Sequence, residues 1–204
     1  MENTDTYFTL SHPATGIFRD RGSRFLSFAY PARTSEECAG QLEKLRHEYR
    51  DARHHCYAYR LDPEKDICRY SDNGEPNGTA GRPVYEQILA HHLFNVHLVV
   101  VRYFGGTLLG TGGLYQAYKK AAADALSNAD IIESFITKDL KLRFSYSVMN
   151  QIMQWIDREH PEIISKDFGE SGNMIVRVRK SKAEDIIERL RIIPEVKINI
   201  LHQE

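Results

Sequence analysis

One stretch carries most of the fold information in the first part of the chain: Val96-His-Leu-Val-Val-Val-Arg-Tyr-Phe-Gly-Gly-Thr-Leu-Leu-Gly-Thr-Gly-Gly-Leu114. Residues 96–104 are apolar on both faces of an extended segment, which is typical of a strand in the middle of a sheet. The glycine-rich residues 105–113 predict a loop, and the helical spacing of the apolar residues that follow predicts a helix over 114–129. Strand, glycine loop and helix in succession indicate α/β structure.

The residues before this stretch extend the same domain. Thr34 and Glu37 have the capping-box spacing of a helix start, and apolar residues from Cys38 to Tyr49 recur on one side of that helix. A second helix is predicted over Val84–Leu93, after a glycine- and proline-rich loop. The strands predicted here are Phe8–Leu10, Ile17–Arg19, Phe25–Tyr30, His54–Arg60 and Ile67–Ser71.

From Thr137 onward the pattern predicts a second domain. Its first strand shows strict alternation, since Leu140, Leu142 and Phe144 are separated by charged residues. Helical spacing follows near 149–156 and 183–190, and the whole order is βαββαβ, the ferredoxin-like arrangement. We therefore expect an α+β protein of two domains. The predicted domains are an α/β sandwich over 1–134 and a ferredoxin-like domain over 137–204, with a short linker near residues 133–136.

Composition narrows the class of protein. The 204 residues carry 27 basic and 28 acidic side chains, so the net charge of −1 excludes a chain that is strongly basic throughout but leaves room for a local basic patch. The longest apolar run, Val96–Val101, is far shorter than the roughly 20 residues that span a membrane. The acidic start lacks a signal region, and three widely spaced cysteines are typical of a reduced protein. We expect a cytoplasmic protein without a membrane partner.

The glycine loop is the strongest candidate site. Glycines allow close approach to backbone N–H groups, and the helix start behind them favours anions. Neither standard nucleotide motif is complete, because Thr111 stands where a P-loop has lysine and Tyr115 where a dinucleotide fingerprint has its third glycine. Two interpretations stay open, a phosphate cradle and tight packing of helix on sheet. The residues of the predicted anion site are Arg102, Gly105, Gly106, Gly110, Thr111, Gly112 and Gly113, with Thr79 and Arg82 from the earlier loop.

Two interpretations also apply to Asp72 and Glu75. The pair could perform acid–base chemistry, or the two carboxylates could cap backbone N–H groups in turns, since Asp-Asn-Gly and Glu-Pro are common turn sequences. Arg102 ends an apolar row of its strand, so this cation either pairs with one of these carboxylates or awaits an anion.

Metal and thiol chemistry find little support in the sequence. Adjacent histidines diverge on a strand or a helix, so neither His54-His55 nor His91-His92 can chelate a metal alone. Cys56 lies in the middle of a predicted strand, where burial leaves a thiol unreactive. We predict no metal site and no cofactor.

The second domain offers a basic sheet face. Its first and third strands are neighbours in the sheet, and their polar sides carry Lys141 and Arg143 on one strand and Arg177 and Arg179 on the other. Four basic side chains on one face are enough for phosphate contacts with RNA. The alternative is an ordinary solvated face, and no outward aromatic residue supports base stacking there.

Two long motifs resemble a known family. Ser71-Asp-Asn-Gly-Glu-Pro-Asn-Gly-Thr-Ala-Gly-Arg-Pro83 and Val99-Val-Val-Arg-Tyr-Phe-Gly-Gly-Thr-Leu-Leu-Gly-Thr-Gly-Gly-Leu114 closely resemble the YigZ/IMPACT family, as does Asp51-Ala-Arg-His-His-Cys56. The second domain is similar to that of the bacterial YigZ-like branch. The resemblance implies a first domain like the second domain of a small-subunit ribosomal protein, and a second domain like domain V of elongation factor G.

The resemblance also implies a role in translation. The eukaryotic branch acts in translational control, where it restrains a starvation-responsive kinase with the help of an additional N-terminal domain. Our main hypothesis is a non-enzymatic RNA- or ribosome-associated protein in translation or its regulation, with RNA, the ribosome or a translation factor as partner. The alternative is a small enzyme for a phosphorylated metabolite or nucleotide, held at the glycine loop with Asp72 or Glu75 as acid or base.

Overall fold

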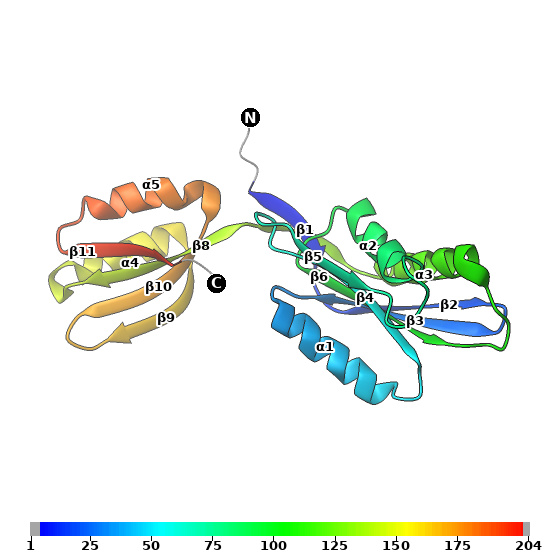
Figure 1. Cartoon of the computed structure of the whole chain (residues 1–204). Helices are drawn as coiled ribbons and strands as arrows, with labels where there is room; N and C mark the ends of the chain where they lie inside the picture. Colours follow the sequence, from blue (N-terminus) through cyan, green and yellow to red (C-terminus); the bar gives the residue numbers. More distant parts are fainter. Residues whose placement is uncertain (1–4, 202–204) are drawn as a thin grey trace. The chain divides into compact units, whose positions relative to one another are not determined.

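The structure, a computed structural model, describes residues 5–201 in two compact units (Figure 1). The N-terminal unit is Tyr7–Ser134. The C-terminal unit contains residues 135–201 together with residues 5 and 6. No helix within the described range is long and apolar enough to cross a membrane.

The N-terminal unit is built on a five-stranded antiparallel sheet with the order β2-β3-β6-β4-β5. The central strand β6 comes from the apolar run of the sequence and is buried along almost its whole length. Side chains alternate between the faces, so Leu98 and Val100 face one layer of helices while Val99 and Val101 face the other. The strands are β2 (Ala14–Asp20), β3 (Ser23–Pro31), β4 (His54–Leu61), β5 (Ile67–Ser71) and β6 (Val96–Tyr103).

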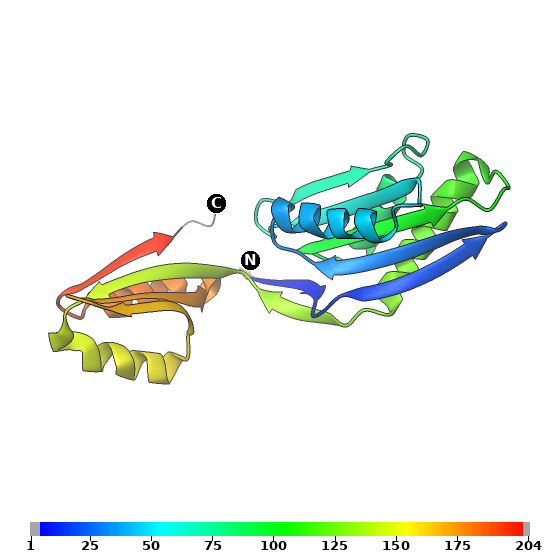
Figure 2. The same cartoon turned by 90° about the horizontal axis from the view of Figure 1, so that it is seen from below.

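Helices cover both faces of this sheet. α2 (Gly81–Ala90) and α3 (Gly110–Ser127) pack on one face, and α1 (Ser35–Glu48) packs on the opposite face (Figures 1 and 2). The hydroxyl of Thr34 accepts a hydrogen bond from the backbone N–H of Glu37, so the predicted cap of α1 is confirmed. The α/β sandwich is thus one helix, a sheet and two helices.

The starts of two helices differ from the expectation. α2 begins at Gly81 instead of Val84, and α3 at Gly110 instead of Leu114, so part of each glycine-rich loop is helical. Glycine is unfavourable inside a helix, so the glycines in these first turns predicted loop instead of helix. Part of the residues expected as a short linker, 133–136, lies in a strand. This strand is β7 (Ile131–Phe135), which pairs with β1 (Thr6–Leu10) in a small separate sheet, as suits its two β-branched isoleucines.

The C-terminal unit has the predicted ferredoxin-like topology. Four antiparallel strands have the order β11-β8-β10-β9, and two helices share one core with the inward residues of β8 and β10. The predicted α+β two-domain fold class is confirmed. The elements are β8 (Thr137–Phe144), η1 (Tyr146–Val148), α4 (Met149–Glu159), β9 (Glu162–Phe168), β10 (Gly172–Arg179), α5 (Lys180–Arg191) and β11 (Val196–Leu201).

Candidate functional site

A cleft of about 830 Å³ opens in the N-terminal unit where β6 ends and α3 begins. Four residues that the sequence singled out as anion-binding or catalytic line it: Glu75, Arg102, Gly110 and Thr111. Its volume lies in the range of roughly 300–1,000 Å³ that is usual for small-ligand sites. The lining residues are Asp51, Ala52, Arg53, His54, Glu75, Pro76, Arg102, Tyr103, Phe104, Leu108, Leu109, Gly110, Thr111 and Leu114.

The glycines beside the cleft have different physical roles. A Cβ on Gly105 would lie 1.9 Å from the backbone carbon of Gly22, so this position permits close packing against the β2–β3 turn. Gly106 and Gly110 have positive φ angles of 88° and 70°, which glycine adopts at little cost. A Cβ on Gly112 would meet nothing within 4 Å. Packing therefore accounts for Gly105 but not for Gly112.

The start of α3 has no side-chain cap. Its N-cap residue is Leu109, which carries no acceptor, and no side chain bonds to the cap. The first N–H groups of a helix lack partners within the helix, and the aligned peptide dipoles give this end a partial positive charge. Gly110 and Thr111, the first two residues of α3, both line the cleft. The helix start thus offers donors and positive potential to the cleft.

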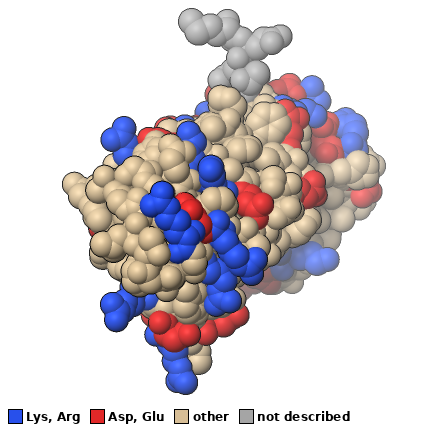
Figure 3. Space-filling view, turned by 90° about the vertical axis from the view of Figure 1, so that its right-hand side faces the viewer, with Lys and Arg blue, Asp and Glu red and all other residues tan. Residues whose placement is uncertain are grey.

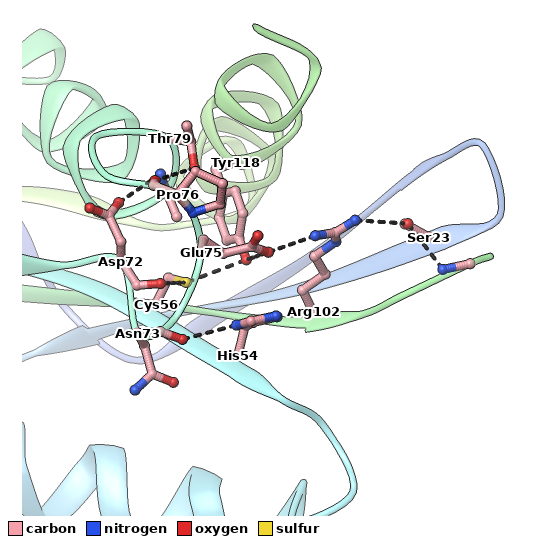
Figure 4. A network of polar contacts seen from close by, with 12 residues as sticks. Ser23, His54, Cys56, Asp72, Asn73, Glu75, Pro76, Thr79, Arg102 and Tyr118 are labelled. Carbon is pink, nitrogen blue, oxygen red and sulfur yellow. Dashed lines mark hydrogen bonds and ion pairs between the residues drawn. The ribbon is translucent and has the colours of Figure 1, made fainter. Parts of the chain in front are cut away.

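Arg102 is held by a carboxylate. Its side chain is only 6% exposed, and Nη1 donates to Oε1 of Glu75 over 2.7 Å (Figure 4). Nη2 lies 3.4 Å from the Ser23 hydroxyl, whereas Nε has no hydrogen-bond partner among the described residues. Of the two outcomes that the sequence left open, the structure shows the ion pair. One buried donor of the guanidinium is still unused.

Glu75 also links Arg102 to the interior of the unit. Oε1 accepts a second hydrogen bond, 2.9 Å long, from the hydroxyl of Tyr118. The Cys56 thiol lies 3.3 Å from that hydroxyl and 2.9 Å from the carbonyl oxygen of Asp72. Burial raises the pKa of the Cys56 thiol, so the group stays protonated and is a poor nucleophile, as expected for a cysteine in the middle of a strand.

Asp72 caps α2. Oδ1 accepts from the backbone N–H groups of Ala80 and Gly81, and Oδ2 accepts from that of Gly78, over 2.8–2.9 Å. This is the turn-and-cap role that the sequence offered as one interpretation. Thr79 in the loop and Arg82 in the first turn of α2 also have partners close by. Thr79 donates its hydroxyl to the carbonyl oxygen of Pro76, and Arg82 pairs with Glu86 on α2. The structure does not bring Thr79 or Arg82 to the cleft lining.

His54 and His55 diverge as predicted. His54 is the register partner of Arg102 across β4 and β6, and its Nδ1 bonds to the carbonyl oxygen of Asn73 (Figure 4). His55 is buried, and its burial lowers its pKa. Residues 5–201 contain no group of three or more His, Cys, Asp or Glu side chains placed to hold a metal ion.

A second hollow, of about 470 Å³, lies beside the cleft, and we call it the arginine hollow. The exposed residues Arg19, Arg21 and Arg24 line it, and the Arg24 guanidinium lies 4.6 Å from the ring centre of Tyr103. Tyr103 also lines the cleft, so the two hollows adjoin. Figure 3 looks at this end of the N-terminal unit and shows Lys and Arg side chains gathered there, with some acidic side chains among them.

Sequence reasoning missed the arginine hollow. Its signal is the sequence Arg19-Asp-Arg-Gly-Ser-Arg24, which places three arginines around the β2–β3 turn. It also missed two exposed apolar residues at the rim of the cleft, Phe104 and Leu108, which are 54% and 82% exposed. In the sequence, Phe104 directly precedes Gly105, and Leu108 lies between Gly106 and Gly110.

The basic sheet face of the C-terminal unit is partly neutralised. Both nitrogens of Arg177 that face Asp139 bond to its carboxylate, at 2.8 and 2.9 Å. Arg179 donates to the buried Asp5 over 2.7 Å, and this bond holds the pKa of Asp5 well below its usual range. The other two basic residues of the face are exposed. They are Lys141 and Arg143.

Comparisons with known proteins agree with the two motifs. The family described as Impact N-terminal domain matches residues 21–126, which is more than half of the chain. The chain belongs to the IMPACT family. An IMPACT family member of Haemophilus influenzae is 34% identical over 79% of this chain and 80% of its own length. The Escherichia coli IMPACT family member YigZ is 33% identical over 76% and 78%.

A solved structure of a hypothetical protein is 28% identical and covers 98% of both chains with a TM-score of 0.75, so the likeness in fold includes both units. The expected resemblance to the YigZ/IMPACT family is confirmed by the family match and the relatives given above.

Proposed function

We propose that this IMPACT-family protein is a non-enzymatic, RNA- or ribosome-associated protein that acts in the cytoplasm in translation or its regulation. The observation that carries the proposal is the arginine hollow, with its three exposed arginines next to a cleft that adds Arg53 and an uncapped helix start. The net charge of the chain is −1, so this local concentration of cations is not a consequence of overall composition.

The residues around the two hollows suit single-stranded nucleic acid. Arginines neutralise phosphates and stack on bases, and exposed aromatic rings provide stacking platforms that accept any base. Phe104 is such a ring, because it is more than half exposed at the rim of the cleft. Tyr103, already covered by Arg24, lies between the two hollows. Phosphate contacts and stacking contacts thus occur side by side.

The C-terminal unit supplies a second, weaker contact surface in this proposal. Lys141 and Arg143 are its exposed cations, whereas Arg177 and Arg179 serve the ion pairs described above. The resemblance of the family to proteins of translational control supports the ribosome or a translation factor as the physiological partner.

The two carboxylates of the enzymatic alternative already have partners. Asp72 accepts from the backbone N–H group of Gly78 in the loop and from those of Ala80 and Gly81 at the start of α2, and Glu75 accepts from Arg102 and Tyr118. A general acid or base must be able to exchange a proton with its substrate. Both carboxylates have structural partners that compete with that task.

RNA affinity as a function of salt tests the proposal. We expect the unmodified protein to bind a labelled single-stranded oligoribonucleotide, measured by fluorescence anisotropy, with an affinity that falls steeply as salt rises. Arg19→Gln, Arg21→Gln and Arg24→Gln combined should reduce the log–log slope by about 2, because each contact to a single strand contributes about 0.7.

The control removes the same charge elsewhere. Arg33, Arg69 and Arg191 are exposed and line neither hollow, so their combined replacement by Gln should leave the slope unchanged. Replacing Lys141 and Arg143 by Gln should give a smaller reduction than the arginine-hollow variant. Equal slopes for the arginine-hollow variant and the control, or no RNA binding at all, would contradict the proposal.

A further inference from the structure

We infer that the cleft binds a phosphate monoester, the terminal phosphate of a nucleotide or of a single-stranded RNA end, at the first turn of α3. If the ligand is an RNA end, this inference rests on the proposed function; if it is a free nucleotide, it does not. Three features carry it: the uncapped helix start, an unused donor on a buried arginine, and Tyr103, which lines both the cleft and the arginine hollow.

The helix start provides the anion-binding donors. α3 is 18 residues long, begins with Gly110 and Thr111 in the cleft wall, and has no side-chain cap. Its first N–H groups and its dipole favour a negatively charged ligand. Gly112 follows in the same turn and carries no side chain in the open space beside it. A phosphate oxygen can therefore approach this backbone closely.

Arg102 supplies an independent indication of a ligand. Its side chain lines the cleft and is only 6% exposed. The Nε atom has no hydrogen-bond partner among the described residues. A buried donor without a partner costs about 1–3 kcal/mol, and a small rotation of the guanidinium toward an acceptor oxygen in the cleft would recover it. The Glu75 ion pair is made by Nη1 and leaves Nε available.

The charges of the cleft also favour an anion. Two cations, Arg53 and Arg102, face two carboxylates, Asp51 and Glu75. Asp51 accepts a hydrogen bond from the Tyr103 hydroxyl over 2.8 Å, and Glu75 is paired with Arg102. The formal charges balance, so the partial positive charge of the helix start makes the cleft attractive to an anion.

The residues that line the cleft indicate the class of ligand. The lining contains apolar groups for a base or sugar, including Phe104, Leu108 and Leu114, and its volume accommodates a nucleotide. Tyr103 connects the cleft to the arginine hollow, where further phosphates of a chain would lie. With its terminal phosphate at the helix start, the remainder of the ligand would extend past Tyr103 toward the arginine hollow.

Binding measurements with matched probes test the inference. The small-ligand arm compares 5′-AMP with adenosine by calorimetry. The RNA arm compares one single-stranded oligoribonucleotide with a phosphate on its 5′ end, on its 3′ end or on neither. We expect a terminal phosphate to raise affinity by about 10–100-fold, as hydrogen bonds to a charged group do.

Thr111→Asp is the decisive variant. Thr111 is exposed in the first turn of α3, where an added carboxylate stabilises the helix and competes with the phosphate, so the fold should persist while phosphate discrimination disappears. Thr107→Asp is the matched control, because Thr107 is exposed in the preceding loop and does not line the cleft. It should retain the preference for phosphorylated probes, and circular dichroism should show both variants folded.

The outcomes separate this inference from the proposed function. Discrimination in the nucleotide arm alone identifies a free nucleotide as ligand, and discrimination in the RNA arm identifies an RNA end. RNA binding that depends on the arginine hollow but ignores terminal phosphates would overturn the inference and leave the proposed function intact. Equal binding by Thr111→Asp and Thr107→Asp, or no discrimination in either arm, would also overturn it.

Discussion

Gly105 and Gly112 belong to the same glycine-rich stretch but tolerate a side chain very differently. The backbone of Gly105 touches that of Gly22 and Ser23, since an added Cβ would lie 1.9 and 2.1 Å from their atoms. The corresponding position at Gly112 is open. At the residue scale, therefore, one glycine serves the packing of the N-terminal unit and the other keeps a helix start accessible.

Alanine substitutions measure this difference. Gly105→Ala should lower the free energy of unfolding of the N-terminal unit by about 3 kcal/mol, because backbone atoms must move. Gly112→Ala should leave it within about 1 kcal/mol of the unmodified protein, since alanine suits a helix better than glycine. Urea unfolding followed by circular dichroism gives both values. Similar losses for the two variants would show that the assignment of roles is wrong.

His97 should make the N-terminal unit less stable at acid pH. The side chain is fully buried on β6, its Nδ1 lies 2.9 Å from Oε1 of Gln41, and burial lowers its pKa to about 4. In the unfolded chain the pKa is about 6.5, so between these values only the unfolded state binds the proton. The stability that this group provides is complete above pH 6.5 and falls by about 3 kcal/mol as the pH drops to 4.

Unfolding curves recorded from pH 7 to pH 4 check this prediction. His97→Gln should flatten the dependence, although His55, whose pKa burial also lowers, contributes a part in the same direction. Trp155 is the single tryptophan and is buried in the C-terminal unit, so its fluorescence reports on that unit separately. An unchanged pH dependence in the variant would contradict the role of His97.

At the scale of elements, α2 depends on a carboxylate that lies outside it. Asp72 precedes the helix by nine residues and still accepts hydrogen bonds from Ala80 and Gly81, because the loop folds back on itself. Asp72→Ala should therefore lower the free energy of unfolding by about 2 kcal/mol, the upper range for loss of a cap. Asp72→Asn keeps one acceptor oxygen and should lose less. Thermal unfolding of the two variants makes the comparison, and equal stability of Asp72→Ala and the unmodified protein would contradict the capping role.

The start of α2 could not be predicted from the sequence, and the same is true of α3. The periodicity of apolar residues predicted α2 and α3, but a cap nine residues away and glycines inside a first turn concealed their starts. The residues of β7 resembled a linker because β7 pairs with β1, which is far away in the sequence. A pattern within Ile131–Phe135 does not reveal that pairing. Patterns local in sequence were predictable, and pairings distant in sequence were not.

At the scale of the molecule, the order of elements specified the fold, whereas the site depended on three-dimensional contacts. Alternation and helical spacing predicted the βαββαβ order of the C-terminal unit. The sequence also singled out Arg102 and Glu75, although only the structure shows them paired and Arg102 with an unused donor. Thr79 and Arg82 were nearby in sequence but face other partners. The arginine hollow could not be predicted from the sequence, because it forms where the β2–β3 turn lies beside Tyr103.

We propose that RNA contacts this protein at the arginine hollow and the adjoining cleft. Ultraviolet cross-linking in cells, followed by mass spectrometry of the adducts, tests this contact, because aromatic side chains at the contact become joined to bases. We expect nucleotide adducts on the segments 19–24 and 103–111 of the N-terminal unit. Recovery of the protein without RNA, or adducts confined to other segments, would contradict it.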